Sequence, residues 1–227
     1  MTVLVVAAHP DDEVLGCGGT IARHTANGEH VVLLLLGNGL ASRDDGNNKI
    51  NECELSALRS ATDAAADVLG ISKIFRIPFP DNRMDEIARL DVVKAVESIV
   101  QTVLPSTVYT HFEHDVNVDH SVTYNAVLTA CRPQPEHSVD LLLSFEVPSS
   151  TEWRFGLPSE KFSPNWFVDI SDTIDAKMRA LHCYKEEMRA YPHPRSVKAV
   201  ESLASWRGAT VGVNAAEAFQ LRRMIIK

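Results

Sequence analysis

The amino-acid sequence predicts an α/β fold: a Rossmann-like, doubly wound and mostly parallel sheet in a three-layer α/β/α arrangement, as a single domain over 1–227. Short apolar runs alternate with longer amphipathic stretches along the first two thirds of the chain. No linker, repeat or low-complexity segment divides it. Because the runs are continuously apolar, they are typical of parallel strands covered by helices on both faces.

Five apolar runs are expected to form strands, with a helix in each of the four intervals between them. The strands are 2–8, 30–37, 73–79, 106–112 and 140–147, and the helices are about 17–27, 50–69, 86–103 and 118–131. Gly28 and Gly70 stand where two of these helices would end, and glycine is favoured just beyond a helix C-terminus. Doubly wound folds place such strands in the spatial order third, second, first, fourth, fifth.

The last third of the chain has a different character. Three prolines between residues 148 and 165 indicate a loop. Three elements are expected after it: a strand at 167–170, a helix from Ser171 or Asp172 to about Met188, and a helix near 196–206.

Composition excludes several classes of protein. The net charge of -8 and the pI near 5.6 argue against a nucleic-acid partner. No run reaches the ~18 apolar residues of a membrane span, and no basic region precedes the first strand as in a signal peptide. The four cysteines form no CxxC pair, so we expect reduced thiols in a cytoplasmic protein; they are Cys17, Cys53, Cys131 and Cys183.

Potential metal ligands follow two of the predicted strands. The segment His9-Pro10-Asp11-Asp12-Glu13 comes directly after the first strand, and further histidines and carboxylates fill 111–120 after the fourth. Because these strands are neighbours at the switch point of the sheet, the two clusters should meet. Histidine with carboxylate suits zinc or another divalent first-row metal. One carboxylate alone would indicate a helix N-cap, but two converging clusters favour a metal site.

At these residues the chain resembles the PIG-L/LmbE-like family of zinc-dependent N-deacetylases. The matching motifs are 8–13, Gly16-Cys17-Gly18-Gly19-Thr20, Phe79-Pro80-Asp81, Asn117-Val118-Asp119-His120 and 212–219. They span nearly the whole chain. The resemblance implies a metal-dependent hydrolase that removes the acetyl group of a small amino sugar, free, nucleotide-linked or conjugated. It also implies a homo-oligomer, a trimer or a hexamer.

Carried over by position, the family's roles make His9, Asp12 and His120 ligands of zinc, with ferrous iron or another divalent metal as the alternative. Asp11 then has the position of the general base. We expect Asp119 or Glu13 to orient a metal ligand or a loop through hydrogen bonds, without binding the metal itself.

One departure concerns the second motif, where many family members carry a histidine and this chain has Asn117. An amide can donate a hydrogen bond to an oxyanion but cannot carry a proton. Either Asp11 performs both proton transfers or another histidine substitutes. His193 is the preferred substitute, and His114 is the second.

Substrate-binding residues are expected in two loops that border the same crevice. Arg43 lies in the loop after the second strand and could bind a phosphate or a sugar hydroxyl. Asp81, Asn82 and Arg83 follow the third strand and offer a second sugar-binding set. The alternative for each arginine is a solvated surface charge.

Three other functions stay open. A nucleotide-binding oxidoreductase would use the glycines at 16–19, but they do not form GxGxxG and the adjacent carboxylates would repel a pyrophosphate. A non-catalytic metal-binding or sugar-binding module is favoured by Asn117 and opposed by Asp11, since a binding site needs no base. An amidase or deformylase acting on another small N-acyl conjugate would differ only in its acyl pocket.

Overall fold

Within residues 1–37, 39, 52–135 and 138–227, which the computed structural model describes, seven strands form one sheet in the order β3-β2-β1-β4-β5-β7-β6. The bounds are β1 Thr2–Ala7, β2 His30–Gly37, β3 Lys73–Phe79, β4 Thr107–His111, β5 Leu141–Phe145, β6 Trp166–Asp169 and β7 Ala216–Met224. The first five strands run parallel, whereas β7 is antiparallel to both of its neighbours. The predicted fold class and strand order are confirmed.

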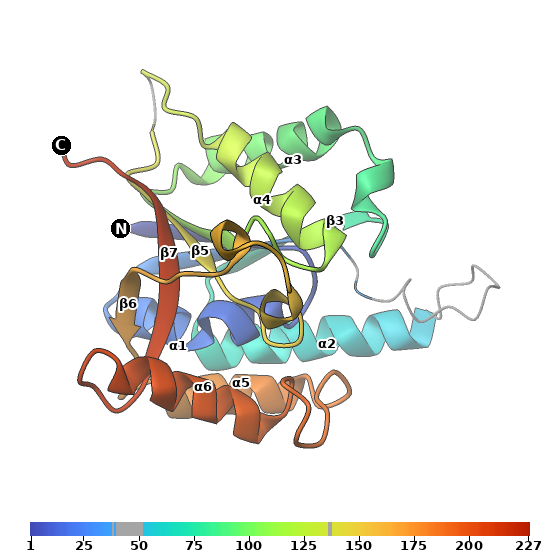
Figure 1. Cartoon of the computed structure of the whole chain (residues 1–227). Helices are drawn as coiled ribbons and strands as arrows, with labels where there is room; N and C mark the ends of the chain where they lie inside the picture. Colours follow the sequence, from blue (N-terminus) through green and yellow to red (C-terminus); the bar gives the residue numbers. More distant parts are fainter. Residues whose placement is uncertain (38, 40–51, 136–137) are drawn as a thin grey trace.

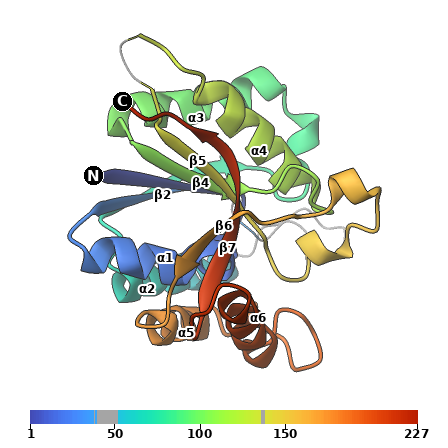
Figure 2. The ribbon, with the colours of Figure 1, turned by 60° about the vertical axis from the view of Figure 1, so that its left-hand side comes forward.

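Helices cover both faces of the sheet (Figures 1 and 2). The bounds are α1 Asp12–Ala26, α2 Glu52–Leu69, α3 Arg89–Val103, α4 Val118–Ala130, α5 Ile174–Cys183 and α6 Val197–Ala209, with short 3-10 helices η2 Met84–Glu86, η3 Thr151–Trp153 and η4 Pro158–Glu160. α3 and α4 lie on one face, and α1, α2, α5 and α6 lie on the other. Among the described helices, none combines the length and the apolar character needed to cross a membrane.

Alternation along β1 explains why the strand is apolar throughout. Val3 and Val5 pack in the core beneath α1, α2 and α5, whereas Leu4 and Val6 pack in the core beneath α3 and α4. Side chains of a strand point to opposite faces in turn, so a central strand covered on both sides has no solvent face. Gly28 and Gly70 have φ near 76° and 73°, as expected of glycines that end helices.

The structure differs from the sequence-based expectations at three elements, and at two of them the expected bounds are wrong. The third, β7, has no predicted counterpart, because its outer half is a mixed polar sequence that lies only partly buried. α5 ends at Cys183 rather than near Met188, and turns follow it. α1 begins at Asp12 rather than near residue 17, and its helical geometry is interrupted at Cys17 (φ -147°, ψ 24°).

The glycines of α1 serve close packing. A Cβ atom built on Gly16 would lie 2.3 Å from the Phe145 ring of β5, and one on Gly19 would lie 2.7 Å from Ile170. Real Cβ atoms do not approach other atoms so closely, so only glycine lets α1 lie against these side chains. The glycine-rich stretch therefore has a packing role in this fold.

A buried ion pair completes the interrupted turn of α1. Lys177 of α5 donates from Nζ to the Leu15 carbonyl oxygen (2.9 Å) and to the Glu217 carboxylate (2.6 Å). Glu217, from β7, accepts the main-chain N–H groups of Gly19 (2.9 Å) and Thr20 (2.7 Å). These contacts satisfy polar groups that a continuous helix would pair internally. The C-terminal third thus holds in place the helix that begins at the site.

We expect Lys177→Ala to lower the free energy of unfolding by about 3–5 kcal/mol, because it leaves the Glu217 carboxylate buried without its cation. Urea denaturation followed by circular dichroism measures the change. Lys185→Ala is the matched control, since the Lys185 side chain is 79% exposed and lies 3.9 Å from Glu186, and should change stability by less than about 0.5 kcal/mol. Equal stabilities of the two variants would contradict the assigned role of the pair.

Candidate metal centre

The two ligand-rich loops meet at the carboxyl edge of the sheet. β1 and β4 pair directly, and the helices that follow them, α1 and α4, lie on opposite faces. This divergence opens a crevice at the switch point. His9, Asp11 and Asp12 enter it from the turn after β1, and His120 enters it from the first turn of α4.

The turn after β1 has an unusual backbone. Asp11 has a φ of 99°, which residues other than glycine adopt uncommonly. Its carbonyl oxygen accepts the N–H groups of Val14 (3.0 Å) and Leu15 (2.9 Å), and α1 begins there. The main-chain N–H of His9 donates to the Asp12 carboxylate at 2.9 Å. Backbone conformations of this kind cluster at functional sites, and here one holds two adjacent carboxylates buried.

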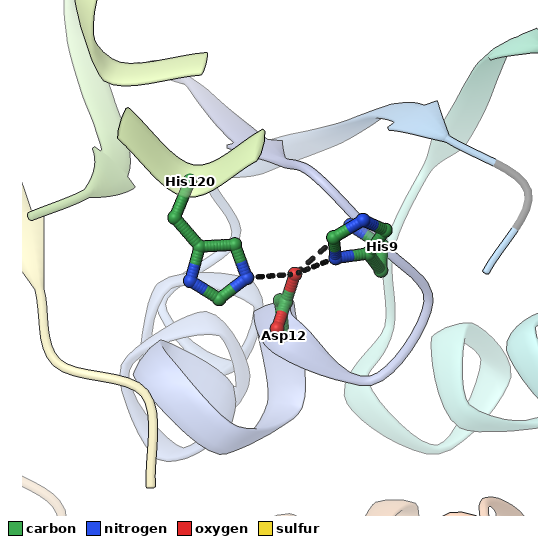
Figure 3. A group of neighbouring side chains, drawn as sticks. All are labelled: His9, Asp12 and His120. Atoms are coloured by element: carbon green, nitrogen blue, oxygen red, sulfur yellow. Dashed lines mark hydrogen bonds and ion pairs between the residues drawn. The ribbon is translucent and has the colours of Figure 1, made fainter. Parts of the chain in front are cut away.

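Three buried side chains converge on one point. The Oδ2 atom of Asp12 lies 3.3 Å from Nδ1 of His9 and 3.3 Å from Nε2 of His120 (Figure 3). One potential ligand atom of each residue lies within 4.8 Å of the other two. Two imidazole nitrogens with a carboxylate oxygen are a ligand set for zinc that leaves a fourth position for water or substrate. The structure therefore brings the three predicted ligands together.

A second layer of carboxylates orients the two imidazoles. Nε2 of His9 lies 2.9 Å from Asp119 and 2.9 Å from Asp81. These three residues form a second group of potential ligands that shares His9. Asp119, however, already accepts the main-chain N–H groups of Asn82 (2.6 Å) and Met84 (2.9 Å). Asp119 therefore ties the loop after β3 to the histidine, as outer carboxylates do in metal sites.

His120 has a similar support. Its Nδ1 atom lies 3.2 Å from Oδ2 of Asp115. Asp115 in turn accepts hydrogen bonds from the hydroxyl groups of Ser150 and Thr151, the latter at 2.7 Å. The segment after β5 thus fixes the orientation of a ligand on α4. Asp115 belongs to the ligand-rich stretch 111–120, but nothing in the sequence links it, Ser150 or Thr151 to His120.

The buried carboxylates around His9 and His120 favour positive charge at this point. Burial lowers the pKa of His120, but the charges of Asp12 and Asp115 outweigh it and raise the pKa to about 9. Burial likewise opposes protonation of His9, whose pKa is nevertheless raised well above its usual value by hydrogen bonds to Asp119 and Asp12. A divalent cation can replace these protons among the buried carboxylates, so the donor set fits a metal ion.

His111, at the end of β4, contacts both the turn after β1 and the ring of His120. Its Nε2 atom accepts the main-chain N–H of Ala8 at 2.8 Å, and its ring stacks on that of His120 with centroids 3.9 Å apart. Burial, together with the nearby His120, lowers the pKa of His111 well below its usual value. The neutral ring fixes the start of the ligand loop relative to α4.

A cavity of about 320 Å³ opens above the three ligands. Its lining is almost entirely polar: His9, Pro10, Asp11, Asp12, Gly39, Asp81, Asn82, Asn117, His120, Ser149, Ser150, Glu187, Arg189 and Arg195. Of the residues predicted to bind substrate, Asp81 and Asn82 line the cavity. Arg83 does not: it donates two hydrogen bonds to Glu86, at 3.0 and 2.7 Å. Arg43 lies outside the described residues.

Asn117 lines the cavity while capping α4. Its Oδ1 atom accepts the main-chain N–H of Asp119 (2.9 Å), and its Nδ2 atom donates to Oδ1 of Asn82 (3.0 Å). A side-chain amide carries two N–H bonds, so one is left for a further acceptor. The amide thus links the loop after β3 to the start of α4.

The two histidines predicted as proton carriers lie outside the cavity lining. Nδ1 of His193 accepts the main-chain N–H of Arg195 (3.0 Å), and the ring packs edge-on against Trp153. His114 is partly exposed and lies 3.5 Å from Glu113. His193 therefore shapes the turn that carries Arg195, and the cavity receives the arginine rather than the histidine.

Arg195 is the main residue that sequence reasoning missed. Its Nη1 atom donates to Oδ2 of Asp11 at 3.0 Å, and its Nε atom donates to the Ser149 hydroxyl at 3.1 Å. Burial raises the pKa of Asp11 to about 8, against the opposing charge of Arg195. The segment Tyr191-Pro192-His193-Pro194 drew attention to the right turn, but no spacing rule distinguishes the arginine two residues beyond His193.

Comparisons with known proteins agree with this description. The family model PIG-L, described as GlcNAc-PI de-N-acetylase, matches residues 4–131. The chain is 31% identical over 189 residues to YaiS of Escherichia coli K12, an uncharacterized deacetylase, covering 81% of this chain and 90% of the relative. It is 30% identical over 192 residues to a diacetylchitobiose deacetylase of Thermococcus kodakarensis, covering 82% and 69%.

Similarity of fold extends to a protein with a different activity. The structure of GalB, a 4-carboxy-2-hydroxymuconate hydratase from Pseudomonas putida KT2440, aligns with a TM-score of 0.77 and 21% identity, over 100% of this chain and 98% of that one. At this identity the likeness concerns the fold alone.

The fold and the site together define a doubly wound α/β protein with a candidate histidine–carboxylate metal centre at its switch point. More than half of the chain matches one family model, and two relatives share 30% identity or more over most of its length. The chain belongs to the PIG-L family.

Proposed function

We propose that this chain hydrolyses the acetamide of a small amino sugar to a free amine and acetate, with a divalent metal ion held by His9, Asp12 and His120. The convergence of these three side chains beneath a polar cavity, with the Asp11 carboxylate beside them, carries the proposal. Family membership and the deacetylase relatives support it. Zinc is the metal that the ligand set favours, and ferrous iron is the alternative.

The chemistry divides between the metal ion and Asp11. When bound, a divalent ion supplies Lewis acidity, which acidifies a water molecule and polarises the amide carbonyl. Asp11 uses one carboxylate oxygen for Arg195, and the other is left to take the proton of the attacking water. Asp11 then returns that proton to the amine nitrogen as the C–N bond breaks, because His193 and His114 do not line the cavity.

Two amides provide neutral polar contacts. Asn117 lines the cavity, and its remaining N–H can donate to the oxyanion of the tetrahedral intermediate. Asn82, held by Asn117 and by Asp119, contacts sugar hydroxyl groups together with Asp81. A cavity of about 320 Å³ lies at the small end of ligand sites, which favours a single sugar ring in the cavity with any conjugated group outside it.

Metal analysis combined with product release tests this function. The full chain is assayed for metal content and for stoichiometric release of amine and acetate from N-acetylglucosamine, N-acetylgalactosamine, diacetylchitobiose and a nucleotide-linked N-acetylhexosamine, with and without chelator. We expect about one metal ion per chain, as three-ligand sites hold, and chelator-sensitive release from at least one compound.

Parallel assays with N-formyl and N-propionyl hexosamines define the acyl pocket. Release of formate in preference to acetate would replace the deacetylase with a deformylase. A metal-loaded protein that releases no amine from any N-acyl sugar would contradict the proposed function.

A further inference from the structure

The Asp11 carboxylate, the proposed base, is held by a residue far away in the sequence. Arg195 lies 184 residues from it, beyond the 4–131 segment that matches the family model. Its guanidinium is largely buried, with 24% of the side chain exposed. A base contributes to catalysis only when its proton-accepting oxygen is placed within hydrogen-bond reach of the water, so its orientation matters as much as its presence.

Arg195 connects three separate segments at this point. It donates from Nη1 to Asp11 in the turn after β1 and from Nε to Ser149 in the segment after β5. Its own main chain is fixed as well, since its N–H donates to His193 and its carbonyl oxygen accepts the N–H of Arg189. A guanidinium bound at two edges and anchored at its backbone has a single orientation.

We infer, on the basis of the proposed function, that Arg195 is the positioning residue for the base: it binds Oδ2 of Asp11 and thereby leaves Oδ1 directed to the attacking water. Asp11 needs such a partner because its backbone has a strained left-handed conformation and its neighbour Asp12 repels it. Arg195 acts through Asp11 alone and takes no part in holding the metal ion.

The test is a double-mutant cycle in the metal-loaded full chain. We expect Arg195→Ala to lower kcat by about 10–100-fold, the scale of a misplaced reacting group, while KM, metal content and secondary structure stay as in the wild type. In an Asp11→Asn background the same substitution should lower kcat by less than about threefold, because the two residues act as one unit. Arg195→Lys should give an intermediate kcat, since an ammonium reaches Asp11 but cannot also bind Ser149.

A matched control removes another arginine from the same third of the chain. Arg207 of α6 binds Glu146 through two hydrogen bonds of 2.8 Å and is similarly buried. Arg207→Ala should lower stability without changing kcat. A crystal structure of the Arg195→Ala protein, in which the Asp11 carboxylate leaves its present position, gives a readout independent of activity.

Several results would overturn the inference. Equal losses of kcat in both backgrounds, a loss confined to KM, loss of metal from Arg195→Ala, or an unmoved Asp11 carboxylate would each do so. If Arg195→Ala does not fold, Arg195→Lys is used in both backgrounds with the same criterion. A wild-type protein without amine release would instead count against the proposed function, and the position of Asp11 would still decide the role of Arg195.

Discussion

Asp11→Asn should keep its metal ion and lose turnover by about 10²–10⁴-fold, the usual contribution of a positioned base. The substitution preserves shape and a hydrogen-bond acceptor for Arg195, but an amide cannot take a proton from water. Metal content should stay unchanged, because Asp11 is not among the three converging ligands. Steady-state kinetics of amine release and elemental analysis of the same preparations measure both quantities.

The neighbouring carboxylate provides the comparison for this prediction. Asp12→Asn should lose metal as well as activity, since the Asp12 oxygen lies 3.3 Å from a nitrogen of each ligand histidine. An Asp11→Asn enzyme with a kcat within tenfold of the wild type would show that another group is the base.

His120→Ala should remove the metal ion and with it all chelator-sensitive activity. The loss of a direct ligand should weaken metal binding by more than the roughly 10–100-fold that follows loss of an outer hydrogen-bond partner. Competition with a chromophoric zinc chelator measures the affinity. Asp115→Ala should weaken metal binding less than His120→Ala does, because Oδ2 of Asp115 lies 3.2 Å from Nδ1 of His120 and is not itself a ligand. The two affinities therefore distinguish a direct ligand from a residue that orients one.

His182→Ala is the control for loss of a histidine. His182 lies on α5, where its Nδ1 contacts the Met178 carbonyl oxygen, and it does not line the cavity. It should bind metal as the wild type does. Undiminished metal affinity in His120→Ala would show that the ion is held elsewhere, for which the group formed by His9, Asp81 and Asp119 is the remaining candidate among the described residues.

Most strands of the sheet could be predicted from the sequence, because the apolar runs that form them are local features of the chain. A strand buried on both faces must be apolar at every position, and this marks β1 and β2 without ambiguity. β7 lacked such a signal. Leu221 to Arg223 lie only partly buried and include two arginines, and Met224 is exposed, so the pattern resembles a solvated segment.

The site divides in the same way. His9, Asp11 and Asp12 stand together in one turn, and topology alone connects this turn with His120. The groups that support them follow no spacing rule: Asp115 reaches His120 only because Ser150 and Thr151 fold back over it. Residue type also misled, since histidine is the usual proton carrier and this drew attention to His193.

The sequence by itself determined the five parallel strands, their order and the meeting of the loops after the first and fourth of them, because hydrophobic periodicity and the switch-point rule act over short stretches or whole strands. The choice of His9, Asp12 and His120 as ligands came from the family resemblance. Only the tertiary structure decided that Arg195 binds Asp11, that His193 lies outside the cavity and that Lys177 and Glu217 complete α1. The contacts of Arg195 with Asp11, of Lys177 with Leu15 and of Glu217 with Gly19 each join residues more than a hundred positions apart. Such partners depend on how the C-terminal third packs against the rest of the fold.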